Sequence, residues 1–225
     1  MKFKIVSLFV LCAILISCGT SRQGGKKQRK GTKAQVVLTP EQQRKYDYFF
    51  LEASRLKMKD DYSAAFDLLQ HCLTINPNAS SALYEISQYY MYLKQVPQGQ
   101  AALEKAVEND PDNYWYSQGL ASLYQQQNEM QKATNLLESM ATRFSDRMDP
   151  LYSLLDIYNR LEEYDNVITT LNRLEEKMGK NEQLSMEKFR IYLQKKDNQS
   201  AFREIESLVE EYPMDMRCLL YTSDA

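Results

Sequence analysis

Glycine and proline are scarce in this sequence, with 7 and 6 residues respectively among 225. Hydrophobic residues make up 44% of the chain and charged residues 26%. This balance, with so few residues that interrupt helices, suits packed helices better than sheets or disorder. The composition therefore predicts an all-α protein.

Residues that could carry catalysis or bind metal are nearly absent. The sole histidine, His71, stands beside Cys72, and no orienting acid is evident for an imidazole base. No group of residues has metal-ligand spacing, and the only Gly-Gly pair, Gly24-Gly25, is not part of a phosphate-binding motif. We therefore expect a protein that is not an enzyme and needs neither a metal nor a cofactor.

Acidic residues are missing from the first 40 positions, and the first of them is Glu41. The chain from residue 41 onward carries 20 basic and 30 acidic residues, a net charge near −10. Phosphate backbones would repel such a body, so we expect no nucleic-acid partner. The segment before it carries six basic residues: Arg22, Lys26, Lys27, Arg29, Lys30 and Lys33.

No apolar run is long enough to cross a bilayer as a permanent helix. Two lysines precede a run of twelve residues from Ile5 to Ile16, broken only by a serine, which is typical of a secretory signal. The run ends in Leu15-Ile16-Ser17-Cys18, which resembles the bacterial lipobox, whose cysteine is acylated and becomes the first residue after cleavage. We predict a signal peptide over residues 1–17 and a lipid anchor on Cys18; the alternative is an unlipidated cysteine after an ordinary signal.

The segment 18–38 joins this anchor to the rest of the chain. From Gly19 to Lys33 it has no apolar cluster, so it is predicted to be a flexible basic tether. Its charge could contact anionic headgroups, or the tether could be a solvated linker without a specific partner. Cys72 falls at an apolar helix position and Cys218 lies near the end of the chain, so no structural disulfide is expected.

A period of 34 residues runs through the remainder, and it divides residues 39–215 into five units. The units are 46–79, 80–113, 114–147, 148–181 and 182–215. Position 11 of each unit reads Leu56, Tyr90, Tyr124, Tyr158 and Tyr192. Position 20 reads Ala65, Gly99, Ala133, Val167 and Ala201, and position 24 reads Leu69, Leu103, Leu137, Leu171 and Ile205. Position 32 reads Pro77, Pro111, Ser145, Gly179 and Pro213.

Each unit is predicted to form two amphipathic helices, because positions 4, 7, 8 and 11 lie at helical spacing, as do positions 20, 24 and 27. The small residue at position 20 lets the two helices approach closely. Thr39 is expected to cap the first helix, with Pro40 in its first turn. Turns within the five units are expected at Lys59-Asp60-Asp61, Gln95-Val96-Pro97, Gln127-Asn128, Glu162-Glu163 and Lys196-Asp197-Asn198. Turns between units are expected at Asn76-Pro77, Asp110-Pro111-Asp112, Asp149-Pro150 and Tyr212-Pro213.

This pattern resembles the tetratricopeptide repeat (TPR) family, in which positions 8 and 20 are small, position 11 is tyrosine and position 32 is proline. The matching residues are Ala53, Ala121, Ala65, Ala133, Tyr90, Tyr124, Pro77 and Pro111. The resemblance covers residues 46–215, and it weakens where Leu155 and Phe189 replace the small residue and Gly179 replaces the proline. It implies an all-α, right-handed superhelix (α-solenoid) of five helix-turn-helix repeats plus a truncated sixth.

The sixth unit would begin at Met216 and is cut after Ala225. We interpret residues 216–225 as a truncated tail, with the last residues read as a sequencing artefact and the natural protein as longer.

The resemblance also implies a concave groove, lined by positions 2, 5, 9, 12 and 13 of the first helices. The candidate groove residues are Tyr84, Gln88, Tyr92, Trp115, Gln118, Ser122, Gln125, Tyr152 and Asp156. Aromatic rings with amide neighbours suit an extended polypeptide, and the groove does not resemble the basic clamp by which some family members hold acidic tails. Two alternatives stay open: tolerance of these residues on solvated helices, and packing of Trp115 between units.

Together these features resemble TPR lipoproteins of the Bacteroidetes kind. The predicted function is a non-catalytic scaffold that binds other proteins, as peptide segments or envelope proteins, on the periplasmic face of an outer membrane. One alternative is an outer-membrane assembly or pilotin-like factor, and another is a glycan-binding lipoprotein.

The register makes a prediction about stability at Leu103, the large residue at position 24 of the second unit. The substitution Leu103→Ala should lower the free energy of unfolding by about 2 to 5 kcal/mol, because it opens a cavity between two helices. A thermal melting temperature that did not change would argue against the register.

Overall fold

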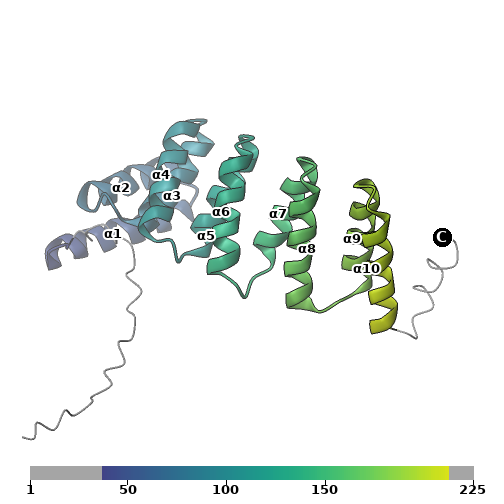
Figure 1. Ribbon diagram of the computed structural model, residues 1–225. Coiled ribbons are helices and arrows are strands. Elements are labelled where there is room, and N and C mark those ends of the chain that lie inside the picture. The colour runs from purple at the N-terminus through teal and green to yellow at the C-terminus, as the bar shows by residue number, and fades with distance from the viewer. Residues whose placement is uncertain (1–36, 213–225) are drawn as a thin grey trace, which may run out of the picture. The chain divides into compact units, whose positions relative to one another are not determined.

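The computed structural model describes residues 37–212, so the predicted signal, the acylated Cys18, most of the tether and the tail 216–225 lie outside the described residues. Within 37–212 there are ten α-helices and no strand, and the helices follow one another in five pairs (Figure 1). The first helices are α1 (Pro40–Lys57), α3 (Ser80–Tyr92), α5 (Tyr114–Gln126), α7 (Asp149–Arg160) and α9 (Glu182–Gln194). The second helices are α2 (Tyr62–Ile75), α4 (Val96–Asn109), α6 (Met130–Arg143), α8 (Tyr164–Met178) and α10 (Asn198–Glu211).

Extensive contacts between helices link sequence neighbours, from α1 with α2 through to α9 with α10. Such a chain of local contacts defines a solenoid, because each unit buries its apolar faces only against the units beside it. The predicted fold class, an all-α array of helix pairs, is confirmed. None of the described helices is long and apolar enough to span a membrane.

The predicted start of the first helix is confirmed. Thr39 is the N-cap of α1, and its Oγ1 accepts a hydrogen bond from the Gln42 backbone N–H at 3.2 Å. The Gln42 side chain accepts in return from the Thr39 N–H at 2.9 Å, which completes a capping box. Pro40 occupies the first turn, where the absence of its N–H is harmless.

Two expected turns are placed differently, and proline is the reason in both. Val96 and Pro97 begin α4, and Asp149 and Pro150 begin α7. A proline in the first turn of a helix loses no intrahelical hydrogen bond, so it marks a helix start here instead of a turn.

Small residues at position 20 hold each pair together. Ala65, Ala133, Val167 and Ala201 are fully buried, and Gly99 is buried at the same position. At Gly99 the approach is closest, since a Cβ atom added there would lie 3.1 Å from the backbone oxygen of Ser87. The large residues at position 24 are at most 3% exposed. The two positions therefore act as the predicted small and large halves of each helix contact.

In each helix pair, the turn between the two helices contains a residue with left-handed backbone conformation, at position 15 of the unit. These residues have φ between 56° and 60°, and they are Asp60, Lys94, Asn128, Glu162 and Lys196. The following N–H donates to the carbonyl of position 11, as from Glu163 to Tyr158 at 2.9 Å. This is the Schellman ending of a helix, for which glycine is the usual left-handed residue. None of the five is glycine, so the predicted turns carried no indication of a left-handed backbone.

One lysine is buried at a position where three other units have an apolar residue and the first unit has the partly exposed Glu52. Lys188 stands at position 7, which is Ile86, Leu120 and Leu154 in the three preceding units, and it is 2% exposed. Its Nζ lies 2.9 Å from a carboxylate oxygen of Glu175 on α8 and 2.9 Å from one of Glu204 on α10. An ion-paired lysine thus replaces the apolar contact between α8, α9 and α10.

A second lysine completes this network. Lys180 lies 3.0 Å from Glu204 and 3.4 Å from Glu175. Burial favours the neutral form of Glu204, but hydrogen bonds from Lys188 and Lys180 outweigh it and lower the pKa of Glu204. Burial also acts against the charge of Lys188, yet the hydrogen bonds to Glu204 and Glu175 prevail and raise the pKa of Lys188. Both groups are therefore held in their charged forms.

The left-handed turn residue yields one prediction. Glu162→Gly should raise the free energy of unfolding by about 0.5 to 1 kcal/mol, because glycine adopts positive φ without a Cβ clash. Asn128→Gly is the matched control, and its gain should be smaller since asparagine tolerates this region. Urea unfolding measures both, and equal gains or a loss at Glu162 would contradict the assignment.

The buried ion network around Lys188 yields a second prediction. Lys188→Ala should lower the free energy of unfolding by about 3 to 5 kcal/mol, because it leaves carboxylates without their buried partner. Lys188→Leu should cost less, since leucine fills this position in the third and fourth units. Chemical denaturation of both variants measures whether Lys188→Ala loses more stability than Lys188→Leu.

The same network sets a pH dependence. A lowered pKa at Glu204 stabilises the fold above the unfolded carboxyl pKa, and this contribution disappears as pH falls through the folded value. The raised pKa of Lys188 makes its contribution complete below the unfolded lysine pKa and lost only as pH rises past the folded one. The Lys188–Glu204 pair should therefore make its full contribution to the free energy of unfolding between about pH 5 and pH 10. The double variant Lys188→Leu/Glu204→Leu should lose less stability than the parent between pH 7 and pH 3.

Candidate functional site

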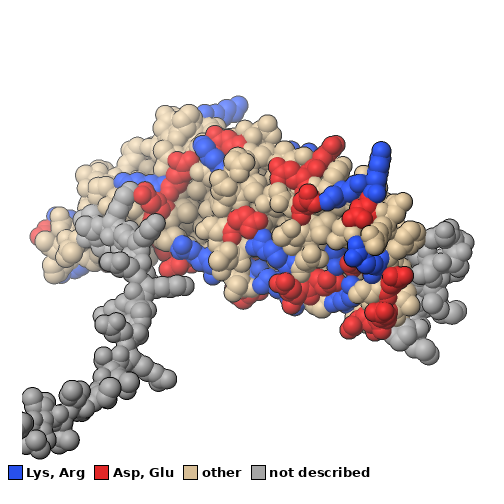
Figure 2. All heavy atoms as spheres, in the orientation of Figure 1, with Lys and Arg blue, Asp and Glu red and all other residues tan. Residues whose placement is uncertain are grey.

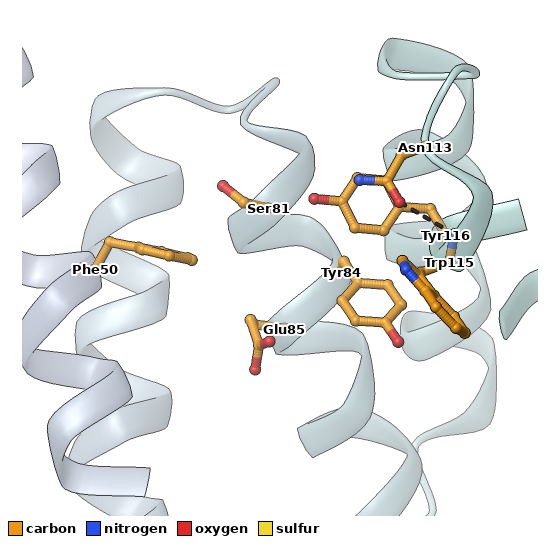
Figure 3. A pocket seen from close by; sticks show the side chains of 7 residues that line it. All are labelled: Phe50, Ser81, Tyr84, Glu85, Asn113, Trp115 and Tyr116. Carbon is orange, nitrogen blue, oxygen red and sulfur yellow. Dashed lines mark hydrogen bonds between the residues drawn. The ribbon is translucent and has the colours of Figure 1, made fainter. Parts of the chain in front are cut away.

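All nine predicted groove residues lie on three first helices, α3, α5 and α7, and none is buried. Three of the four aromatic members are exposed: Tyr92 is 80% exposed, Trp115 63% and Tyr152 48%. Two of the nine, Tyr84 and Trp115, meet in a hollow of about 370 Å³ between the first helices of the first three units (Figure 3). The hollow is lined by Phe50, Ser81, Tyr84, Glu85, Asn113, Trp115 and Tyr116.

The repeat places these side chains. Phe50 on α1 and Tyr84 on α3 both stand at position 5, while Ser81 and Trp115 both stand at position 2. Stacking of identical units brings identical positions side by side along the array. The hollow therefore extends across three units and is built mainly from first helices.

Ring contacts fix the walls. The Tyr84 ring lies 4.8 Å from the Tyr116 ring, centroid to centroid, at an interplanar angle of 32°. Phe50 stacks on Tyr46 at 5.9 Å, and the Tyr46 hydroxyl is hydrogen-bonded to Ser81 Oγ at 3.0 Å. Such contacts limit the rotamers of Phe50 and Tyr84, so the aromatic wall is preorganised.

Trp115 is supported from one side only. Its backbone N–H donates to Asn113 Oδ1 at 3.1 Å, and its ring meets the Tyr114 ring edge to face at 5.3 Å. The guanidinium of Arg147 lies 3.9 Å from the Tyr114 centroid and 5.5 Å from that of Trp115. The rest of the indole is open to solvent, so the alternative of a tryptophan packed between units is wrong.

Glu85 is the only charged residue that lines the hollow. One of its oxygens, Oε2, lies 2.7 Å from Lys57 Nζ, and this hydrogen bond raises the pKa of Lys57. Burial raises the pKa of the Tyr116 hydroxyl, and the charges of Asp110 and, to a smaller extent, Glu85 add to the rise. The one charge that lines the hollow is therefore negative, and it is paired with Lys57.

The other seven predicted residues lie outside this hollow. Several have partners of their own: Gln118 accepts from the Tyr114 hydroxyl at 3.0 Å, and the Tyr152 hydroxyl donates to Met178 Sδ at 3.3 Å. Asp156 lies 3.9 Å from Arg160 in an exposed ion pair. The remaining ones are Gln88, Tyr92, Ser122 and Gln125. The predicted groove therefore contains one aromatic hollow, with the other candidates distributed along α3, α5 and α7.

Sequence reasoning missed five lining residues. Phe50 stands at position 5 of the first unit and Ser81 at position 2 of the second. Both are groove positions of the repeat, so applying the position rule to every unit would have found them. Asn113 lies in a join, while Glu85 and Tyr116 stand at positions 6 and 3. No periodic signal marks these three.

The described residues offer no reaction chemistry at the hollow. His71 on α2 faces the Phe49 ring at 5.5 Å instead, and burial raises the pKa of the neighbouring Cys72 thiol to about 11. A thiol with that pKa is a poor nucleophile near neutral pH. Between residues 37 and 212 no three or more His, Cys, Asp or Glu side chains gather as a metal site.

Charge on the visible face of the array is mixed. Figure 2 shows lysine and arginine interspersed with aspartate and glutamate over the described helices, without a broad basic area on this face. Such a surface lacks the basic stripe that follows a phosphate backbone.

The comparisons with known proteins agree with this architecture. Residues 80–113, which are the second unit, match the family model described as "Tetratricopeptide repeat". A comparison with curated proteins found no match.

Solved structures match over most of the chain. A MamA protein has a TM-score of 0.55 at 17% identity, covering 78% of this chain and 96% of its own. A tetratricopeptide repeat protein from Parabacteroides merdae has a TM-score of 0.56 at 16% identity, covering 78% and 70%. YrrB, described as a TPR protein with an unusual peptide-binding site, has a TM-score of 0.53 at 13% identity, covering 78% and 90%.

Identity this low shows the fold and nothing finer. The second unit matches the tetratricopeptide repeat model, and the helix pairs on both sides of it continue the same arrangement. The described chain is an α-solenoid with the fold of tetratricopeptide repeat proteins.

Proposed function

We propose that this chain is a non-catalytic, lipid-anchored scaffold of the bacterial cell envelope, which binds segments of other proteins along its first helices. The aromatic hollow between α1, α3 and α5 carries this proposal. Aromatic side chains that are exposed yet held in place give contact area at low entropy cost, as at protein interfaces. The structural likeness to YrrB, itself described as having a peptide-binding site, supports a polypeptide ligand.

The amino terminus supports the anchor. A short apolar run ends in Ser17-Cys18, and the following segment is basic up to Lys33. Two or three acyl chains on Cys18 would hold the protein to a membrane, since a single chain binds only marginally. We place the anchored protein on the periplasmic face of an outer membrane.

The short connections favour a scaffold over a glycan-binding protein. No connection between successive helices from α1 to α10 exceeds five residues. A sugar platform would need longer loops, and a barrel-assembly factor would be expected to have longer and less regular units than the constant 34 residues seen here.

The anchor is tested by Cys18→Ser in cells fed an alkyne analogue of palmitate. The parent should carry the label and sediment with membranes, and the variant should lose the label and move to the soluble fraction. Equal labelling of the two proteins would contradict the anchor.

The binding surface is tested by a photoreactive residue at Trp115 in intact cells. Specific envelope proteins should be crosslinked there and lost when Tyr84→Ala is added, because Tyr84 forms part of the same wall. The matched control is the same residue at Glu176, which is exposed on the second helix α8. The same products at both positions, or none at Trp115, would contradict the proposal.

A further inference from the structure

Four aromatic rings and one carboxylate line the hollow: Phe50, Tyr84, Trp115 and Tyr116, with Glu85 beside them (Figure 3). The faces of aromatic rings carry negative electrostatic potential, so a cation among them is attracted. No basic side chain lines the hollow. The chemistry of these walls therefore favours a positively charged occupant over an anionic one.

The carboxylate can receive a second cation. The recorded ion pair of Glu85 uses Oε2 with Lys57, on the side of α1. Glu85 keeps a second oxygen, and a carboxylate has lone pairs enough for more than one donor. The negative charge of Asp110, which acts on the Tyr116 hydroxyl, adds to the local field.

The neighbouring rings already hold a guanidinium. Arg147 lies over Tyr114 at 3.9 Å and within 5.5 Å of the Trp115 centroid. A planar guanidinium stacks on aromatic faces and pairs with carboxylates at the same time, which an ammonium group does less well. Trp115 is 63% exposed, so part of its ring stays accessible to a second guanidinium in the hollow that it lines together with Tyr84 and Glu85.

We propose that the hollow receives one arginine side chain from an extended segment of a partner protein, between the aromatic rings and the carboxylate of Glu85. The inference rests on the proposed function and specifies the chemistry of the segment that is bound. The chain's own basic segment carries arginine as well, at Arg22 and Arg29, so the experiment separates the two sources.

The test uses the fluorescence of Trp115, the only tryptophan of the chain. The purified protein is titrated at low salt with three capped tripeptides, Gly-X-Gly, in which X is arginine, its neutral analogue citrulline, or leucine. Citrulline has nearly the same shape as arginine, but it is neutral and has an oxygen acceptor in place of one guanidinium nitrogen. The arginine peptide should change the emission to saturation and bind about tenfold more tightly than the other two.

Variants give effects of opposite sign. Glu85→Gln should weaken the arginine peptide about fivefold, whereas Lys57→Gln should strengthen it, because it frees the Glu85 carboxylate from its present partner. A residue with a merely structural role would not produce this reversal. Tyr84→Ala should also weaken binding, while Tyr62→Ala, which removes an exposed tyrosine from the second helix α2, is the matched control and should leave it unchanged.

A chain whose six basic residues between Gly19 and Pro40 are changed to glutamine distinguishes the sources. Unchanged affinity for the arginine peptide supports a partner's arginine. Much tighter binding would mean that the protein's own segment fills the hollow, and this would overturn the choice of a partner.

Two further results of the peptide titration would contradict the proposal. Equal binding of the three peptides, or no binding by any, would overturn the arginine site. Equal binding would leave the groove as a polypeptide site, and crosslinking at Trp115 tests that function separately.

Discussion

Close approach of two helices at position 20 is the contact on which the array depends. Alanine, glycine or valine stands there in all five units, and each is buried against the facing first helix. Because no unit can bury its apolar faces alone, each contact fixes the position of the next pair. The first helices are thereby held side by side with one face uncovered, and position 5 of one unit comes beside position 2 of the next. The hollow at Tyr84 and Trp115 is a consequence of that spacing.

Two parts of the array depart from the uniform repeat. The charged network around Lys188 replaces an apolar contact in the fifth unit, whereas the middle units have leucine and isoleucine at the same position. The aromatic hollow lies at the other end, among the first three units. The aromatic hollow and the buried ion network therefore lie in separate parts of the array.

Periodic features could be predicted from the sequence, and single-residue features could not. Helix pairing, the buried positions 20 and 24 and the Thr39 cap follow from spacing and local chemistry. Most turns inside the units were predicted at the right residues, but their left-handed backbone was not, because no glycine marks it. The burial of Lys188 was missed because its carboxylate partners come from two other helices. At the site, Tyr84 and Trp115 followed from repeat position, whereas Glu85 and Tyr116 required the packing of α3 against α5.

Removal of one whole unit tests the period most directly. Deletion of residues 114–147 takes out 34 residues and should join α4 to α7 in the arrangement that α4 now has with α5. Circular dichroism should show a cooperative thermal transition with the helical signal per residue unchanged, whereas deletion of 118–147 should abolish cooperativity because it shifts every later contact out of phase. Equal behaviour of the two deletions, or loss of helix in the first, would contradict an array built on this repeat.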